Sequence, residues 1–211
     1  MTTRRIGARI PRNEDPRLLR GLGCFVDDVH PPGILHAASL RSPHAHARIV
    51  RIDATAARRA PGVHLVLTAA ELGELNRPTP LLIPHPTLSH PRTQRPLAVD
   101  EVRYVGEVVA LVVADSRYVA EDAIALIEVE YEPLAVVTDL ATALAPGAPR
   151  VHADVPDNRA ARFRQTVGNA DGVLARAHRV LRERLTVGRG WGSPIEGRCV
   201  VAEWDARRRG L

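Results

Sequence analysis

A run of seven apolar residues, Val108–Ala114, constrains the fold of this chain more than any other feature. It has the length of a strand rather than of a helix, and four of its residues are valine, which favours strands. The run carries no polar residue at alternate positions, so neither face of the strand suits contact with water. We therefore predict a strand at the centre of the core, buried on both faces.

Short strands and short helices are predicted on both sides of this central strand. Further strands are predicted at residues 34–40, 47–52, 63–68, 102–104 and 129–137, the first two adjacent to each other and the last interrupted by Pro133. Helices are predicted at residues 53–60, from Thr68 onward and at 117–128, with a helical turn at 139–144. Asp115 or Ser116 can cap the helix at 117–128. Together these elements predict an α+β fold.

Prolines and charge indicate how the chain is organised. Residues 1–29 are polar and rich in Gly and Arg, which predicts an extended N-terminal arm. Six prolines between residues 76 and 96 predict a long surface loop, because proline lacks a backbone donor and fixes φ. Pro146–Pro149 is a rigid break and marks the predicted end of a domain at 30–146. Residues 147–211 then form a linker and an incomplete β-rich segment.

The final segment contains the patterns of a sheet that is not completed. A short helix is predicted at 170–178, and strands are predicted at 180–187 and 199–205. The sequence shows no third strand that would complete a sheet with these two. A tail of this kind would expose strand edges and apolar side chains, which predicts association with a partner.

Charge and composition limit the classes of partner. All 29 basic residues are arginine, and the net charge of +5 arises in residues 151–211, which hold 12 arginines against 7 acids. With aromatic residues at only 3%, the side chains that stack on bases are scarce, so nucleic-acid binding is disfavoured. No apolar run approaches the length of a membrane span, and Met1–Arg9 does not have the pattern of a secretory signal. We expect a cytoplasmic protein.

No motif in the chain identifies a chemical site. Cys24 and Cys199 lack CxxC spacing and are predicted to be ordinary buried thiols. His44 and His46 could supply two ligands to a metal, but no third ligand lies near in sequence, so polar residues that close a turn are the preferred interpretation. The same interpretation applies to two histidines of the proline-rich loop, His85 and His90.

Two further patterns also have simple structural interpretations. Glu121 and Asp122 are explained by the dipole at the start of a helix. The glycine-rich stretch Gly188–Gly192 has neither the ending of a P-loop nor the spacing of a dinucleotide-binding loop. We therefore assign no catalytic, cofactor-binding or metal-binding residue from these motifs.

Several phrases of the sequence, in order and in register, carry a family resemblance. They include residues 11–28 (PRNEDPRLLRGLGCFVDD), 40–49 (LRSPHAHARI), 102–110 (VRYVGEVVA) and 193–198 (SPIEGR). They resemble the N-terminal part of the molybdenum-binding large subunit of the xanthine dehydrogenase, aldehyde oxidase and carbon monoxide dehydrogenase family. The resemblance implies an α/β hammerhead domain at 30–146, followed at 147–211 by the truncated start of the first molybdopterin-binding domain.

The resemblance also implies which parts of such an enzyme are missing from this sequence. In the family, the catalytic glutamate and the cofactor-binding loops come after the region that this chain resembles. We therefore carry over no catalytic, cofactor or metal residue, and this chain alone is expected to bind no cofactor. The implied assembly contains molybdopterin-molybdenum in the remainder of the large subunit, with iron-sulfur and FAD subunits as partners.

Two hypotheses of function follow. The first is a non-catalytic N-terminal portion or split subunit of a molybdenum hydroxylase, an oxidoreductase, which contributes packing and assembly. The alternative is a free-standing interaction domain or an inactive truncated relic. Whether the chain belongs to an enzyme depends on the larger assembly, and the substrate is determined by residues that this sequence does not contain.

Overall fold

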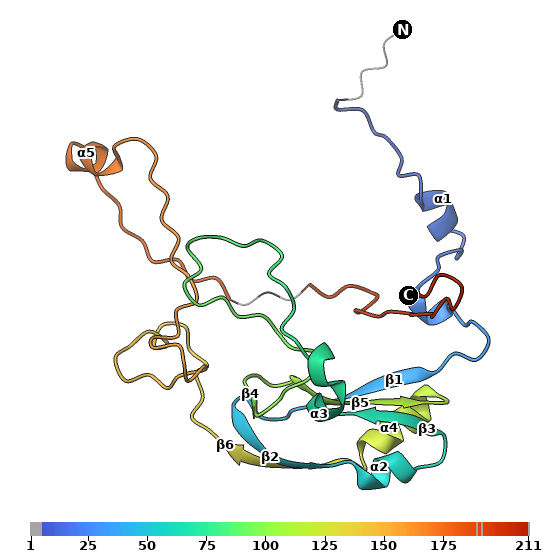
Figure 1. The fold of residues 1–211 in the computed structure, drawn as a ribbon. Coiled ribbons are helices and arrows are strands. Elements are labelled where there is room, and N and C mark those ends of the chain that lie inside the picture. The colour runs from blue at the N-terminus through green and yellow to red at the C-terminus, as the bar shows by residue number, and fades with distance from the viewer. Residues whose placement is uncertain (1–5, 189, 191, 211) are drawn as a thin grey trace. The chain divides into compact units, whose positions relative to one another are not determined.

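The computed structural model describes residues 6–188, 190 and 192–210 (Figure 1). Its strands are β1 (His36–Arg41), β2 (Ala47–Asp53), β3 (Val63–Leu67), β4 (Glu101–Val102), β5 (Val108–Ala114) and β6 (Glu128–Pro133). Its α-helices are α1 (Asp15–Leu18), α2 (Thr55–Arg59), α3 (Ala69–Leu72), α4 (Arg117–Ile124) and α5 (Ala170–Ala175), and 3₁₀ turns lie at η1 (Val26–Asp28) and η2 (Gly73–Leu75). The α+β prediction is confirmed.

Strand β5 is the centre of the core, as its sequence predicts. It lies between β1 and β3 and is antiparallel to both. Its residues 110, 112 and 114 pack on one face with α2 and α4, in a cluster that includes Ala57, Ala120 and Ala123. Val109 points to the opposite face and packs with Ala47, Ala98 and Val102. Because successive side chains of a strand alternate between faces, an all-apolar strand fits only between two apolar layers.

The second sheet has the order β4-β2-β6 and corrects the prediction that the first two strands are adjacent. β1 and β2 do not pair with each other, because the residues that link them are hydrogen-bonded to another part of the chain. Ser42 donates its backbone N–H to the carbonyl of Glu107 over 2.8 Å and accepts the N–H of Gly106 over 2.8 Å. These bonds hold the link against the turn that precedes β5, so it does not close a hairpin.

Helix α4 is capped by Ser116, one of the two predicted candidates. The Ser116 Oγ accepts the N–H of Val119 over 3.3 Å. The helix ends at Ile124, four residues before its predicted end, because two tight turns follow and lead directly into β6. Ile127, at the last of these turns, is buried and packs into the core.

The proline-rich segment 76–96 contains no helix or strand, as predicted. It is fastened at its base, where Asn76 is buried and bonds to both backbone groups of Leu97 over 3.0 Å. The predicted strand at 129–137 ends at Pro133, and the predicted helical turn at 139–144 is a hydrogen-bonded turn that Asp139 opens by accepting the N–H of Ala143.

The described chain divides into two compact units. One spans residues 35–180 and contains both sheets. The other combines the described residues up to 34 with those from 181 onward, and none of its described residues is buried. The first unit continues past Pro146, while the domain limits 30–146 and 147–211 remain predictions.

The second unit corrects two predictions. Residues 180–187 and 199–205 form no ladder in the described part of the chain, apart from an isolated bridge between Asp205 and Gly210. Strand patterns need a neighbouring strand to take up their backbone groups, and none is present there. Cys24 and Cys199 are exposed rather than buried, because this unit offers no core to receive them.

Candidate functional site

The two histidines of the predicted pair do not face a common point. His46 donates its Nδ1–H to the carbonyl of Ala135 over 2.8 Å, and its Nε2 lies 3.8 Å from Glu101 Oε2. The His44 ring packs instead against the ring of Tyr131, with centroids 4.8 Å apart. Among the described residues, no group of three or more His, Cys, Asp or Glu side chains could hold a metal ion. His44 and His46 thus make contacts that secure the ends of β2 and β6.

His85 and His90 connect the proline-rich segment to residues 159–163. His85 lies against the ring of Phe163, with centroids 5.2 Å apart. His90 bonds through Nδ1 to the carbonyl of Arg159 over 3.3 Å and through its backbone N–H to the carbonyl of Ala160 over 3.1 Å. Both histidines therefore make contacts that connect two loops.

The remaining sequence candidates do not gather into a site. Glu121 and Asp122 lie exposed in the middle of α4. The stretch Gly188–Gly192 lies partly outside the described residues. Its three glycines are described and exposed, and added Cβ atoms would meet nothing within 4 Å.

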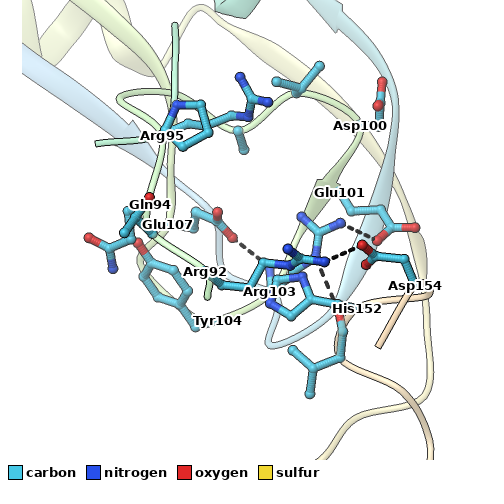
Figure 2. Close-up of a pocket in the computed structure, with 15 residues that line it drawn as sticks. Arg92, Gln94, Arg95, Asp100, Glu101, Arg103, Tyr104, Glu107, His152 and Asp154 are labelled. Atoms are coloured by element: carbon cyan, nitrogen blue, oxygen red, sulfur yellow. Dashed lines mark hydrogen bonds and ion pairs between the residues drawn. The ribbon is translucent and has the colours of Figure 1, made fainter. Parts of the chain in front are cut away.

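The structure shows a cavity that the sequence analysis missed. It has a volume of about 610 Å³ and lies where the end of the proline-rich segment, the β4 region and residues 151–154 meet (Figure 2). Its charged and titratable lining residues come from all three segments and are Arg92, Arg95, Asp100, Glu101, Arg103, Tyr104, Glu107, His152 and Asp154. The elements that meet here are far apart in sequence, so no local pattern could have identified the cluster.

The guanidinium groups of this cavity are each bound to the protein. Arg103 donates from Nη2 to Glu101 Oε2 over 2.8 Å and from Nε to the carbonyl of Val151 over 3.2 Å. Arg92 forms an ion pair with Asp154 (Figure 2). Arg95 donates to the backbone carbonyl of Asn76 over 2.5 Å. These bonds tie three loops together, and the charges of the cluster compensate one another.

The two titratable rings of the cavity are held in their neutral forms at neutral pH. Burial lowers the pKa of His152, and the positive charges of Arg103 and Arg92 lower it further. Burial also raises the pKa of Tyr104, and the negative charge of Glu107 acts in the same direction. Neither ring is bonded to a nucleophile in the described residues. What the bonds of this cluster show is that its side chains tie three loops of the first unit together.

A comparison with protein families decides what kind of domain this is. Residues 20–135 match the family model described as "Aldehyde oxidase and xanthine dehydrogenase, a/b hammerhead domain". The chain belongs to this family. The matched residues include all six strands of the hammerhead domain, and the predicted resemblance is thereby confirmed.

The similarity continues beyond the hammerhead domain into large subunits. The chain is 40% identical over 200 residues to the nicotine 6-hydroxylase large subunit of Paenarthrobacter nicotinovorans, which covers 95% of this chain and 24% of that subunit. It is 41% identical over 213 residues to the carbon monoxide dehydrogenase large chain of Afipia carboxidovorans, which covers 95% of this chain and 26% of the relative. The chain thus spans about a quarter of the length of these relatives.

Solved structures show the same fold. Quinoline 2-oxidoreductase from Pseudomonas putida 86 aligns with a TM-score of 0.69 and 42% identity, over 82% of this chain and 22% of that one. A Cu,Mo-containing CO dehydrogenase aligns with a TM-score of 0.64 and 42% identity, over 80% of this chain and 22% of that one. In both, the hammerhead domain is one part of a much longer chain.

The lining of this cavity does not fit a molybdenum cofactor such as that of the Cu,Mo-containing relative. Phosphate and pterin groups need donors that are free to bind them, whereas Arg92, Arg95 and Arg103 of the cavity are bound to protein groups. Acidic side chains also line the cavity in number. We therefore derive no chemical step at this cavity. In the described part of the hammerhead chain, no helix is long and apolar enough to cross a membrane.

Proposed function

We propose that this chain is the non-catalytic N-terminal portion, or a split subunit, of a molybdenum hydroxylase, in which it contributes packing and assembly. One observation carries the proposal. Almost the whole chain, 95% of it, aligns at about 40% identity with large subunits of such enzymes, yet it spans only a quarter of their length. Among the residues that the structure describes, no group of three or more His, Cys, Asp or Glu side chains could hold a metal ion, which supports a role in packing and assembly.

The internal organisation of the first unit supports a packing role. Its core is made of small and β-branched residues on both faces of β5, and its polar cavity ties three loops together. A domain whose loops are tied together in this way presents a preformed surface to its partners. The proposal places the chemistry, the molybdopterin cofactor and the iron-sulfur and FAD groups in the remainder of the large subunit and in further subunits, within the cytoplasm.

The test is native mass spectrometry of the chain purified from its own host. We expect a complex in which the chain is bound to a larger polypeptide that carries molybdopterin, together with iron-sulfur and flavin subunits. Molybdenum content measured on the same sample should follow the complex rather than the free chain. A lone chain of 23.0 kDa without cofactor would contradict the proposal and favour a free-standing interaction domain or a relic.

A further inference from the structure

The ring of His46 carries a buried nitrogen, Nε2, that has no hydrogen-bond partner among the described residues. The other ring nitrogen, Nδ1, donates its hydrogen to the carbonyl of Ala135, so in the neutral ring Nε2 is an acceptor with a free lone pair. The side chain is only 10% exposed, so solvent does not compensate for the missing donor. Buried polar atoms without a partner are rare in folded proteins, because they lose their bonds to water and gain none in return.

A carboxylate lies close to this nitrogen. Glu101 Oε2 is 3.8 Å from His46 Nε2, and the Glu101 side chain is largely buried as well. While the ring is neutral, both atoms are acceptors and cannot bond to each other. A second proton on the ring, at Nε2, converts the pair into a donor and an acceptor of opposite charge, which form a charge-assisted hydrogen bond. The geometry is therefore unfavourable for the neutral ring and favourable for the protonated one.

The other charged groups around the ring are already paired. From β2, Arg48 forms an ion pair with Glu132 of β6. Arg103, which follows β4, donates to Glu101 Oε2 over 2.8 Å, and Arg150 donates to a backbone carbonyl over 3.3 Å. The three guanidinium groups disfavour a further positive charge at this place, and the two carboxylates favour it. Among these groups, only Glu101 lies against Nε2 and can accept its hydrogen.

A proton on Nε2 also completes a chain of hydrogen bonds between two points of the backbone. At one end His46 bonds to the carbonyl of Ala135, and at the other Arg103 donates from Nε to the carbonyl of Val151 over 3.2 Å. Glu101 connects to Arg103 already, so the bond from His46 to Glu101 is the one missing link. A cavity of about 420 Å³ is lined by this pair and by residues near both ends, so the two ends are not packed directly against each other.

We propose that His46 and Glu101 form a pH-dependent hydrogen bond, which connects Ala135 to Val151 when His46 takes up a proton from solvent at Nε2. At higher pH the ring keeps its bond to Ala135 and loses the bond to Glu101, so the two ends of the segment 136–150 are joined less firmly. The match to the hammerhead domain ends at residue 135, so this bond determines how firmly the chain that follows the domain is held. All of these groups lie in the first unit, and the inference does not depend on the proposed function.

Nitrogen-15 NMR of the histidine side chains in the whole chain tests where the proton lies. Correlations across each ring show which nitrogen carries a hydrogen, and the through-space contact with Ala135 assigns the signals of His46. We expect Nε2 to be without a hydrogen at about pH 8 and to carry a slowly exchanging one at about pH 5, the range in which imidazole ordinarily changes its charge. A ring that stays neutral at the lower pH in the folded chain would overturn the proposal. So would an Nε2 hydrogen that exchanges as fast as that of the exposed His64.

Amide hydrogen exchange tests the effect on the segment. The N–H of Leu134 donates to the carbonyl of His46 over 3.0 Å and reports on this end. After correction for the intrinsic effect of pH on exchange, we expect its protection to rise about tenfold between about pH 8 and about pH 5. His46→Gln should abolish the rise, because glutamine takes up no proton in that range. His64→Gln, which removes an exposed histidine paired with Asp115, should leave the rise unchanged. Equal behaviour of the two variants would overturn the proposal.

Discussion

Two segments of this chain with similar patterns have different structures. Strand β6, with the sequence EVEYEP, alternates polar and apolar residues and pairs with β2 along its whole length. Residues 202–205, with the sequence AEWD, alternate in the same way and form no ladder in the described chain, apart from the isolated bridge of Asp205 to Gly210. Strand β6 also finds side-chain partners, since Glu132 forms an ion pair with Arg48 across the two strands. An alternating pattern therefore permits a strand, and an available neighbour determines whether it forms.

The largest expected difference in stability between the two regions comes from placing the same charge in each. Val112 is fully buried in the core, whereas Val200 is 83% exposed. We expect Val112→Asp to lower the free energy of unfolding by about 3–5 kcal/mol, because it buries a carboxylate that has no partner.

Val200→Asp is the matched control, with an expected change within about 0.5 kcal/mol in the isolated chain. Urea denaturation followed by circular dichroism measures both changes. A similar loss of stability in the two variants would show that the second unit has a core after all.

Loss of the Asn76 bonds at the base of the proline-rich segment is expected to have the next largest effect on the free energy of unfolding. Asn76→Ala removes a side chain that bonds to both backbone groups of Leu97, and both residues are buried. Leaving those groups unsatisfied should cost about 2–3 kcal/mol, measured by urea denaturation.

Thr79→Ala, which removes only an exposed bond to the carbonyl of Gln94, should change stability by less than about 0.5 kcal/mol. If the two variants are equally stable, the segment is not held by Asn76.

Replacing one glycine in each region by alanine compares how strongly the backbone is constrained there. Gly62 has a φ of +78°, and an added Cβ would lie 3.0 Å from Asp115 Oδ2 and 3.3 Å from Val119 Cγ1. Gly62→Ala should therefore cost about 1–2 kcal/mol in thermal unfolding. Gly188→Ala, in the open tail, meets nothing within 4 Å and should have almost no effect. The prediction fails if Gly62→Ala leaves the melting temperature unchanged.

The smallest expected effect is a pH dependence at the cap of α3. The Thr68 hydroxyl bonds to Glu71 and holds the pKa of this carboxyl below its ordinary value of 4.5, and Arg58 acts in the same direction. A lowered pKa in the folded state stabilises the protein above pH 4.5, and this contribution is lost as the pH falls through the lowered value.

Glu71→Gln should therefore lower stability at pH 7 by less than about 1 kcal/mol, since the side chain is 39% exposed. The difference from wild type should shrink on acidification below pH 4.5. A difference that stays constant or grows as the pH falls would exclude this carboxylate as its source.

The sequence predicts the elements of the hammerhead domain well, because each has a local signal. The apolar run of β5, the Ser116 cap and the prolines of the long loop all act within a few residues. Strand pairing is harder to predict from the sequence. The separation of β1 from β2 depends on bonds between Ser42 and the distant Gly106–Glu107 turn.

The cavity and the exposure of the two cysteines are likewise not predictable from the local sequence. Arg92 meets Asp154 across 62 positions of sequence, so no spacing rule connects them. The exposure of Cys24 and Cys199 follows from the missing core around them, which no residue near either cysteine reveals. The family resemblance is detectable from the sequence because it rests on several long matching segments in the same order as in the family, rather than on any single contact.

The most direct test of this account is native-state hydrogen exchange on the isolated chain. If the first unit has a complete core and the second depends on a partner, the amides of β5 should exchange about a thousandfold or more slowly than those of residues 180–187 and 199–205. Comparable protection in all three segments would contradict the account, because the tail would then be folded without any partner.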